Sequence, residues 1–141
     1  MKHLKLFFAL FAMLALGVGN AWAEEATLTF TKACGGTGTD SKGNTWTVTS
    51  DAAESTYDAT KGIHYGTGSK AVSYLQLSTS SISGTITKVE VNASGASSTS
   101  AKLDVTVGGS SFGAQKSLTS SAASYIFEGS AEGKIIIKLS Q

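Results

Sequence analysis

The chain has 141 residues, a formal net charge of +1 and 15% charged residues, with no arginine and no proline. A chain of this length holds one domain built around a single core. Arginine is the usual residue for bidentate phosphate contacts, so its absence, together with the lack of a basic patch, argues against nucleic acid as a partner.

The first 23 residues have the features of an export signal. Lys2 and Lys5 give a positive start, an apolar stretch covers residues 6–18, and residues 21–23 (Ala-Trp-Ala) match a signal peptidase cleavage site. The apolar stretch is short for a membrane span, and no second one follows it. We therefore expect a cleaved signal peptide over residues 1–23 and one domain over residues 24–141. The mature chain is expected to be periplasmic, secreted or on the cell surface, without membrane insertion.

Short runs of alternating apolar and polar residues fill the rest of the chain, and turns rich in Gly and Ser separate them. About nine strands are expected, over residues 26–32, 45–50, 63–65, 71–78, 85–93, 102–107, 112–118, 125–128 and 134–139. Residues 51–62 lack a clear period and are expected to form a loop. Short strands at this spacing, without a convincing helix, predict an all-β, jelly-roll-like sandwich of two antiparallel sheets. Its first and last strands are expected to be central or paired.

The alternation also predicts which side chains form the core. The expected core residues are Leu28, Phe30, Trp46, Val48, Leu75, Leu77, Val89, Val91, Leu103, Val105, Ile135 and Ile137. Ile86 is out of phase with Val89 and Val91, which predicts a β-bulge near residues 87–88. Gly108 and Gly109 predict a tight hairpin after the strand at 102–107.

Three stretches resemble a module of secreted proteins from Bacteroides-type and some Gram-positive bacteria. They cover residues 57–77 (YDATKGIHYGTGSKAVSYLQL), 83–97 (SGTITKVEVNASGAS) and 103–113 (LDVTVGGSSFG). The resemblance implies a jelly-roll sandwich like those of carbohydrate-binding domains, and it implies no catalytic residues.

The side chains for catalysis or metal binding are sparse. His64 is the only histidine after residue 23 and Cys34 the only cysteine, so one chain cannot build a zinc site of Cys and His ligands. Cys34 is interpreted as a small residue closing the first strand. A glycosidase with two carboxylates remains an alternative, because the Asp and Glu residues are scattered through loops, but it is disfavoured because a small, lone sandwich is a poor host for such a cleft. We therefore expect a protein without catalytic residues, which is not an enzyme.

A structural calcium ion is a second alternative that the sequence leaves open. Asp40, Asn44 and Asp51 are oxygen donors close together in the chain, but their spacing matches no fixed calcium loop. The favoured interpretation is that they form turns, so no cofactor and no metal ligands are expected.

Carbohydrate is the leading ligand class for an exported sandwich of this kind. Tyr57 lies in the aperiodic 51–70 region beside Asp58, Lys61 and His64, so it is the best candidate for a ring that stacks on a sugar. These four residues are the expected ligand site. The alternative function is a structural or adhesive protein that pairs with other chains, including another surface protein, through the edges of its sheets.

Overall fold

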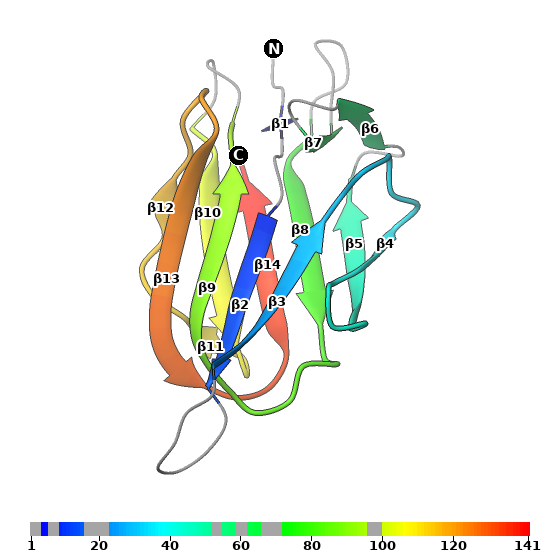
Figure 1. Ribbon diagram of the computed structural model, residues 1–141. Helices are drawn as coiled ribbons and strands as arrows, with labels where there is room; N and C mark the ends of the chain where they lie inside the picture. The colour runs from blue at the N-terminus through cyan, green and yellow to red at the C-terminus, as the bar shows by residue number, and fades with distance from the viewer. Residues whose placement is uncertain are drawn as a thin grey trace.

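Two antiparallel sheets pack face to face in the computed structural model, which describes residues 4–5, 9–15, 23–51, 55–58, 62–65, 72–95 and 100–141 (Figure 1). The described residues contain no helix, and the predicted all-β sandwich is confirmed. The strands are β1 (Leu4–Lys5), β2 (Ala9–Ala15), β3 (Ala23–Thr29), β4 (Thr37–Thr39), β5 (Thr45–Ser50), β6 (Ser55–Asp58), β7 (Gly62–Tyr65), β8 (Tyr74–Thr79), β9 (Thr85–Ala93), β10 (Lys102–Val107), β11 (Ser110–Ser111), β12 (Lys116–Ser117), β13 (Ala123–Ala131) and β14 (Ile135–Ser140).

The order of the strands shows how the chain wraps around its core. The large sheet has the order β11-β10-β14-β8-β5-β4, with β12 also paired to β10, and the small sheet has the order β13-β9-β2-β3. A third group, β1-β7-β6, caps one end of the sandwich. The chain crosses between the large and small sheets four times: from β8 to β9, from β9 to β10, from β12 to β13 and from β13 to β14. This is a jelly-roll-like pattern. Strand β14 is central in its sheet, as expected for the last strand.

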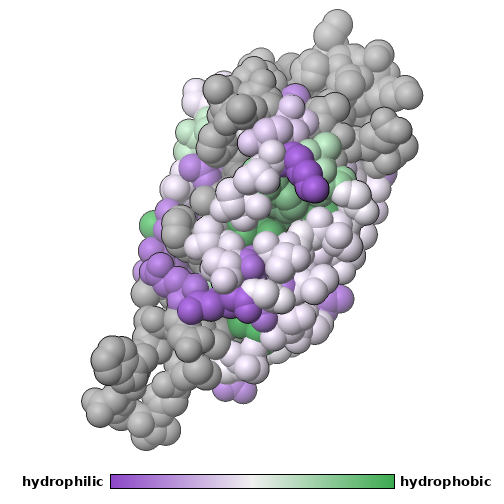
Figure 2. Space-filling view, turned by 45° about the vertical axis from the view of Figure 1, so that its right-hand side comes forward, coloured by the Kyte–Doolittle hydropathy of each residue, from purple (hydrophilic) through white to green (hydrophobic). Residues whose placement is uncertain are grey.

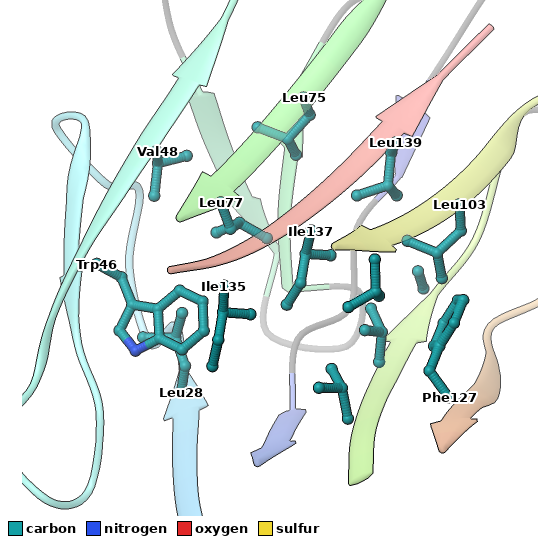
Figure 3. Close-up of a cluster of buried hydrophobic side chains, with 14 of the residues drawn as sticks. Leu28, Trp46, Val48, Leu75, Leu77, Leu103, Phe127, Ile135, Ile137 and Leu139 are labelled. Carbon is teal, nitrogen blue, oxygen red and sulfur yellow. The ribbon is translucent and has the colours of Figure 1, made fainter. Parts of the chain in front are cut away.

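The core lies between the two sheets and contains every side chain that the alternation predicts (Figure 3). Leu75, Leu77 and Ile137 of the large sheet have no exposed surface, and Val89 and Val91 of the small sheet oppose them. Each of these strands alternates buried and less buried positions, because successive side chains of a strand point to opposite faces. Hydrophobic burial on the inner faces therefore holds the sandwich together.

The predicted bulge and hairpin are both confirmed. Along β9, the pairing with β2 passes from Met13↔Lys88 directly to Leu14↔Ile86, so Thr87 is the extra residue. This extra residue explains how Ile86 and Val89 are both buried. Gly108 and Gly109 have φ angles of +62° and +85° and connect the paired residues Val107 and Ser110.

Several local predictions are wrong. Residues 112–118 form no continuous strand: only Lys116–Ser117 pairs with β10, although Phe112 and Leu118 are both buried. Gly113, at φ +80°, takes the chain out of the extended conformation between them. The expected loop at 51–62 contains β6, and the strand β4 was not expected. Both have too few apolar residues to show a period, and they form because a neighbouring strand supplies hydrogen bonds.

The boundaries of several strands also differ from the sequence prediction, and the strand expected at 125–128 extends over Ala123–Ala131. The strand expected at 26–32 runs instead over Ala23–Thr29, and that expected at 71–78 begins only at Tyr74. Strands β1 and β2 lie within residues 1–23. The structure therefore describes the chain with its N-terminal segment in place, and cleavage of this segment stays a prediction.

Candidate functional site

The predicted ligand segment forms part of the end cap. Strands β6 and β7 pair antiparallel, with Thr56 opposite His64 and Tyr57 opposite Ile63. Tyr57 is half-buried and packs against the hydrophobic core, so only part of its ring is offered to solvent. His64 is half-buried, between the fully buried Ile63 and the buried Tyr65. The structure thus places Tyr57 and His64 on one hairpin.

The other two predicted residues are less well defined. Asp58 ends β6, and only its backbone is described, whereas Lys61 lies outside the described residues. A joint ligand site of Tyr57, Asp58, Lys61 and His64 therefore stays a prediction.

A hydrogen bond connects this hairpin to a distant part of the chain. The Cys34 thiol and the Tyr65 hydroxyl group lie 3.1 Å apart (Sγ to Oη) and are hydrogen-bonded. Cys34 is half-buried and packs against the core, but it lies five residues beyond the end of β3 and so does not close that strand as expected. The contact places the segment after β3 beside β7, so the predicted site has a neighbour that sequence reasoning missed.

That neighbour is a hollow of about 520 Å³, open to solvent, along the segment from Thr29 to Thr39. Its lining includes four threonines (Thr29, Thr31, Thr37 and Thr39), together with Phe30, Cys34 and Lys32. Hydroxyl groups both donate and accept hydrogen bonds, and Phe30 supplies an apolar wall that is mostly buried. The side of the molecule in Figure 2 shows recessed hydrophobic surface (green) among pale, weakly polar residues.

Gly38 permits the close packing behind this hollow. A Cβ atom at this position would lie 3.0 Å from Cδ1 of Leu28 and 3.1 Å from Cε1 of Phe30. A larger residue would therefore push β4 away from the side chains of the small sheet. The sequence signal for the hollow was the Thr and Gly run at 35–39, which reads as an ordinary loop because it contains no apolar residue.

Asp40 holds the turn that leads from β4 to β5. Its Oδ1 accepts hydrogen bonds from the backbone N–H groups of Lys42 and Asn44, at 3.0 and 2.9 Å. Its Oδ2 accepts one from the indole N–H of the fully buried Trp46, at 3.0 Å. This is a turn-forming role, as the sequence favoured for Asp40 and Asn44.

Electrostatics in the turn favour the ionised form of Asp40. Burial alone would raise the pKa of Asp40, but the hydrogen bonds from Trp46, Asn44 and Lys42 together outweigh burial and lower the pKa below its ordinary value. The Asp40 carboxylate is therefore a structural acceptor within the turn, and Asp40 is not among the residues that line the hollow.

Asp51, the third oxygen donor, also accepts hydrogen bonds that fix the local backbone, in this case at the start of β8. Its carboxylate accepts hydrogen bonds from the hydroxyl and backbone N–H groups of Ser73 and from the backbone N–H group of Tyr74. The Ser73 hydroxyl is the main cause of its lowered pKa. Among the residues that the structure describes, no group of three His, Cys, Asp or Glu side chains is placed to hold a metal ion.

Comparisons with protein-family models, with curated proteins and with solved structures found no match. In the described part of the chain, no helix is long and apolar enough to cross a membrane.

Proposed function

We propose that residues 24–141 form an exported, non-catalytic binding module whose ligand is a carbohydrate. The hollow beside the β6–β7 hairpin is the observation that carries this proposal. Its size falls in the range of small-ligand sites, about 300–1,000 Å³, and it combines an apolar wall with several polar groups. The Thr hydroxyl groups match the donors and acceptors of sugar hydroxyls.

Two further observations support the same ligand class. Strand β6, which carries Tyr57, pairs with β7, and Tyr65 of β7 is hydrogen-bonded to Cys34 in the lining of the hollow. The sequence resemblance to a module of secreted bacterial proteins implies a jelly-roll sandwich like those of carbohydrate-binding domains. Nucleic acid is disfavoured because the chain has no arginine.

A glycan array probed with the exported protein tests the proposal, followed by calorimetric titration of a glycan that binds. Thr37→Val removes one hydroxyl group from the hollow and preserves the β-branched shape. We expect it to weaken binding roughly 3- to 10-fold, the value of one hydrogen bond. Thr106→Val on β10, four strands from β4 in the large sheet, is the matched control and should leave affinity unchanged.

A separate pair of variants tests whether the Tyr57 ring stacks on the glycan. Tyr57→Ala removes a ring whose stacking contributes roughly 0.5–1.5 kcal/mol, and Tyr57→Phe retains the ring. We expect weaker binding only for the first. A folded protein without any hit on the array, or equal affinities for Thr37→Val and Thr106→Val, would contradict carbohydrate binding in the hollow.

A second candidate function is assembly through a sheet edge, and β13 is the strand that favours it. Strand β13 is nine residues long and lies at the edge of the small sheet, where β9 is its one partner among the described strands. Ile126 on this strand is 46% exposed, and no other large hydrophobic side chain of the described residues is exposed. Exposed hydrophobic edge strands are templates for pairing with another chain.

Concentration-dependent sizing separates the two candidates. If the edge of β13 drives assembly, the exported protein should form oligomers at high concentration, and Ile126→Lys should make it monomeric. Glycan binding would be unaffected by this variant. A protein that remains monomeric at all concentrations would contradict the second candidate.

A further inference from the structure

Strand β2 occupies a central position in the small sheet, although it belongs to the predicted signal peptide. It is antiparallel to β3 along its whole length, from Ala9↔Thr29 to Ala15↔Ala23. It is also antiparallel to β9, from Leu10↔Val91 to Ala15↔Thr85 (Figure 1). No other strand connects β3 to β9 in this sheet.

Cleavage after residue 23 would vacate this position. Neighbouring strands of a sheet lie about 4.8 Å apart, so β9 and β3 would face each other across roughly 10 Å. The vacant position would open onto the core, because Val89 and Val91 of β9 and Leu28 of β3 are at most 1% exposed in its presence. The facing backbone N–H and C=O groups of both strands would lose their partners, and unpaired backbone groups next to a core are costly.

Strand β3 is poorly placed to close the gap itself. It is parallel to β9, since both are antiparallel to β2. Its outer edge is tied to the turn after β4: the Ser41 backbone N–H donates to the Thr27 carbonyl oxygen, and the Thr27 N–H donates to Ser41 Oγ, each at 2.9 Å. A shift of one strand position towards β9 would break both hydrogen bonds.

We propose that the mature chain accepts an antiparallel β-strand from a second polypeptide between β9 and β3. This acceptor slot is independent of the hollow and of carbohydrate binding, and it depends on removal of residues 1–23. Strand addition of this kind uses main-chain hydrogen bonds for affinity and alternate side-chain pockets for specificity.

The walls of the slot define the chemistry of the incoming strand. Apolar residues are required opposite Val91 and Leu28, and again opposite Val89 and Ala26, because these pairs face the core.

The intervening positions of the incoming strand face outward and tolerate polar residues. On β9 they lie opposite Glu90 and Lys88, whose side chains form an ion pair at 3.3 Å. On β3 they lie opposite Thr27 and the exposed Glu25. Proline is excluded from the middle of the strand, since both neighbours need its N–H groups. The partner is thus an extended segment of about seven residues with alternating apolar residues and no proline.

The test uses the protein that a bacterial host exports from the full chain, after its N-terminus is determined by intact mass. The probe is a synthetic peptide with the sequence of residues 9–15 (ALFAMLA) between pairs of added lysines for solubility. The control peptide carries Ala12→Pro. We expect saturable binding of the first peptide, binding at least tenfold weaker for the control, and slower hydrogen exchange of the β9 amides in the presence of the first peptide only.

Four results would overturn the inference. These are retention of residues 1–23 in the exported protein, no binding of the first peptide to folded monomer, equal binding of both peptides, or a dimer in which a second copy already protects the β9 amides. None of these results depends on whether the protein binds glycans, so the two proposals fail separately.

Discussion

The indole N–H group of Trp46 donates a hydrogen bond of 3.0 Å to Oδ2 of Asp40, and both side chains are buried. The bond joins the large sheet's β5 to the turn that precedes it. Trp46→Phe removes this donor and part of the ring volume, and a hydrogen bond to a charged group contributes roughly 1.5–3 kcal/mol. We expect the free energy of unfolding to fall by at least about 1.5 kcal/mol, measured by urea denaturation.

A double-mutant cycle isolates the bond from the loss of volume. Trp46→Phe should cost less in an Asp40→Ala background than in the natural protein. Equal costs in the two backgrounds would show that the hydrogen bond contributes nothing.

Stability should decrease in acid because of the same turn. The pKa of Asp40 is lowered in the folded protein, since its hydrogen bonds outweigh the effect of burial. The unfolded chain therefore binds a proton more readily than the folded chain, and protonation favours unfolding. The stabilisation is complete above the ordinary Asp pKa of about 3.9 and is lost as the pH falls through the folded value. We expect the urea midpoint to decline below about pH 5.

Asp51 contributes an acid dependence of the same sign, because its pKa is also lowered, mainly by the Ser73 hydroxyl group. Asp40→Asn should therefore make the decline shallower without abolishing it. An unchanged pH profile in Asp40→Asn would exclude Asp40 as a source of the acid sensitivity.

The hairpin between β10 and β11 provides a matched pair of glycine substitutions. Gly108 and Gly109 both have positive φ, so Ala at either position has a conformational cost of roughly 1–2 kcal/mol. A Cβ at Gly108 would also lie 2.3 Å from the carbonyl oxygen of Glu132, whereas one at Gly109 would meet nothing within 4 Å. We expect Gly108→Ala to destabilise the protein by about 1–3 kcal/mol more than Gly109→Ala in thermal or urea unfolding. Similar losses in both variants would contradict this geometry.

Burial predicts opposite outcomes for two isoleucines. Ile137 of β14 has no exposed surface, and Ile137→Ala should cost roughly 2–5 kcal/mol through lost burial and the cavity that remains. Ile126 of β13 is 46% exposed, and Ile126→Ala should change the free energy of unfolding by about 0.5 kcal/mol or less. Comparable losses for both would show that β13 is covered by another chain in solution.

The sequence predicts the sandwich and its core well because both follow from strict alternation. Val48, Val105 and Ile137 are buried where the period places them, and the phase slip at Ile86 locates the bulge at Thr87. Strands that contribute almost no apolar surface carry no such signal. Strands β4 and β6 exist because β5 and β7 offer them hydrogen-bonding edges, which is a tertiary effect.

The candidate site is less predictable for a related reason. Composition suggested Tyr57 as a free ring in a loop, but pairing of β6 with β7 packs it against the core. The hollow at 29–39 contains few apolar residues, and the contact that places Cys34 of its lining beside β7 is made with Tyr65, 31 positions away, which no local pattern encodes. Only the turn role of Asp40 and Asn44 could be inferred from residue type alone.

The central place of β14 has a consequence for the order of events during folding. Strand β14 lies between β10 and β8, so the large sheet stays divided into two halves until residues 135–140 are available. A chain that emerges from its N-terminus cannot complete this sheet early, and non-local pairing of this kind is slow. Late completion keeps β10 and β8 apart during synthesis, and it postpones the cooperative folding step until residues 135–140 have emerged.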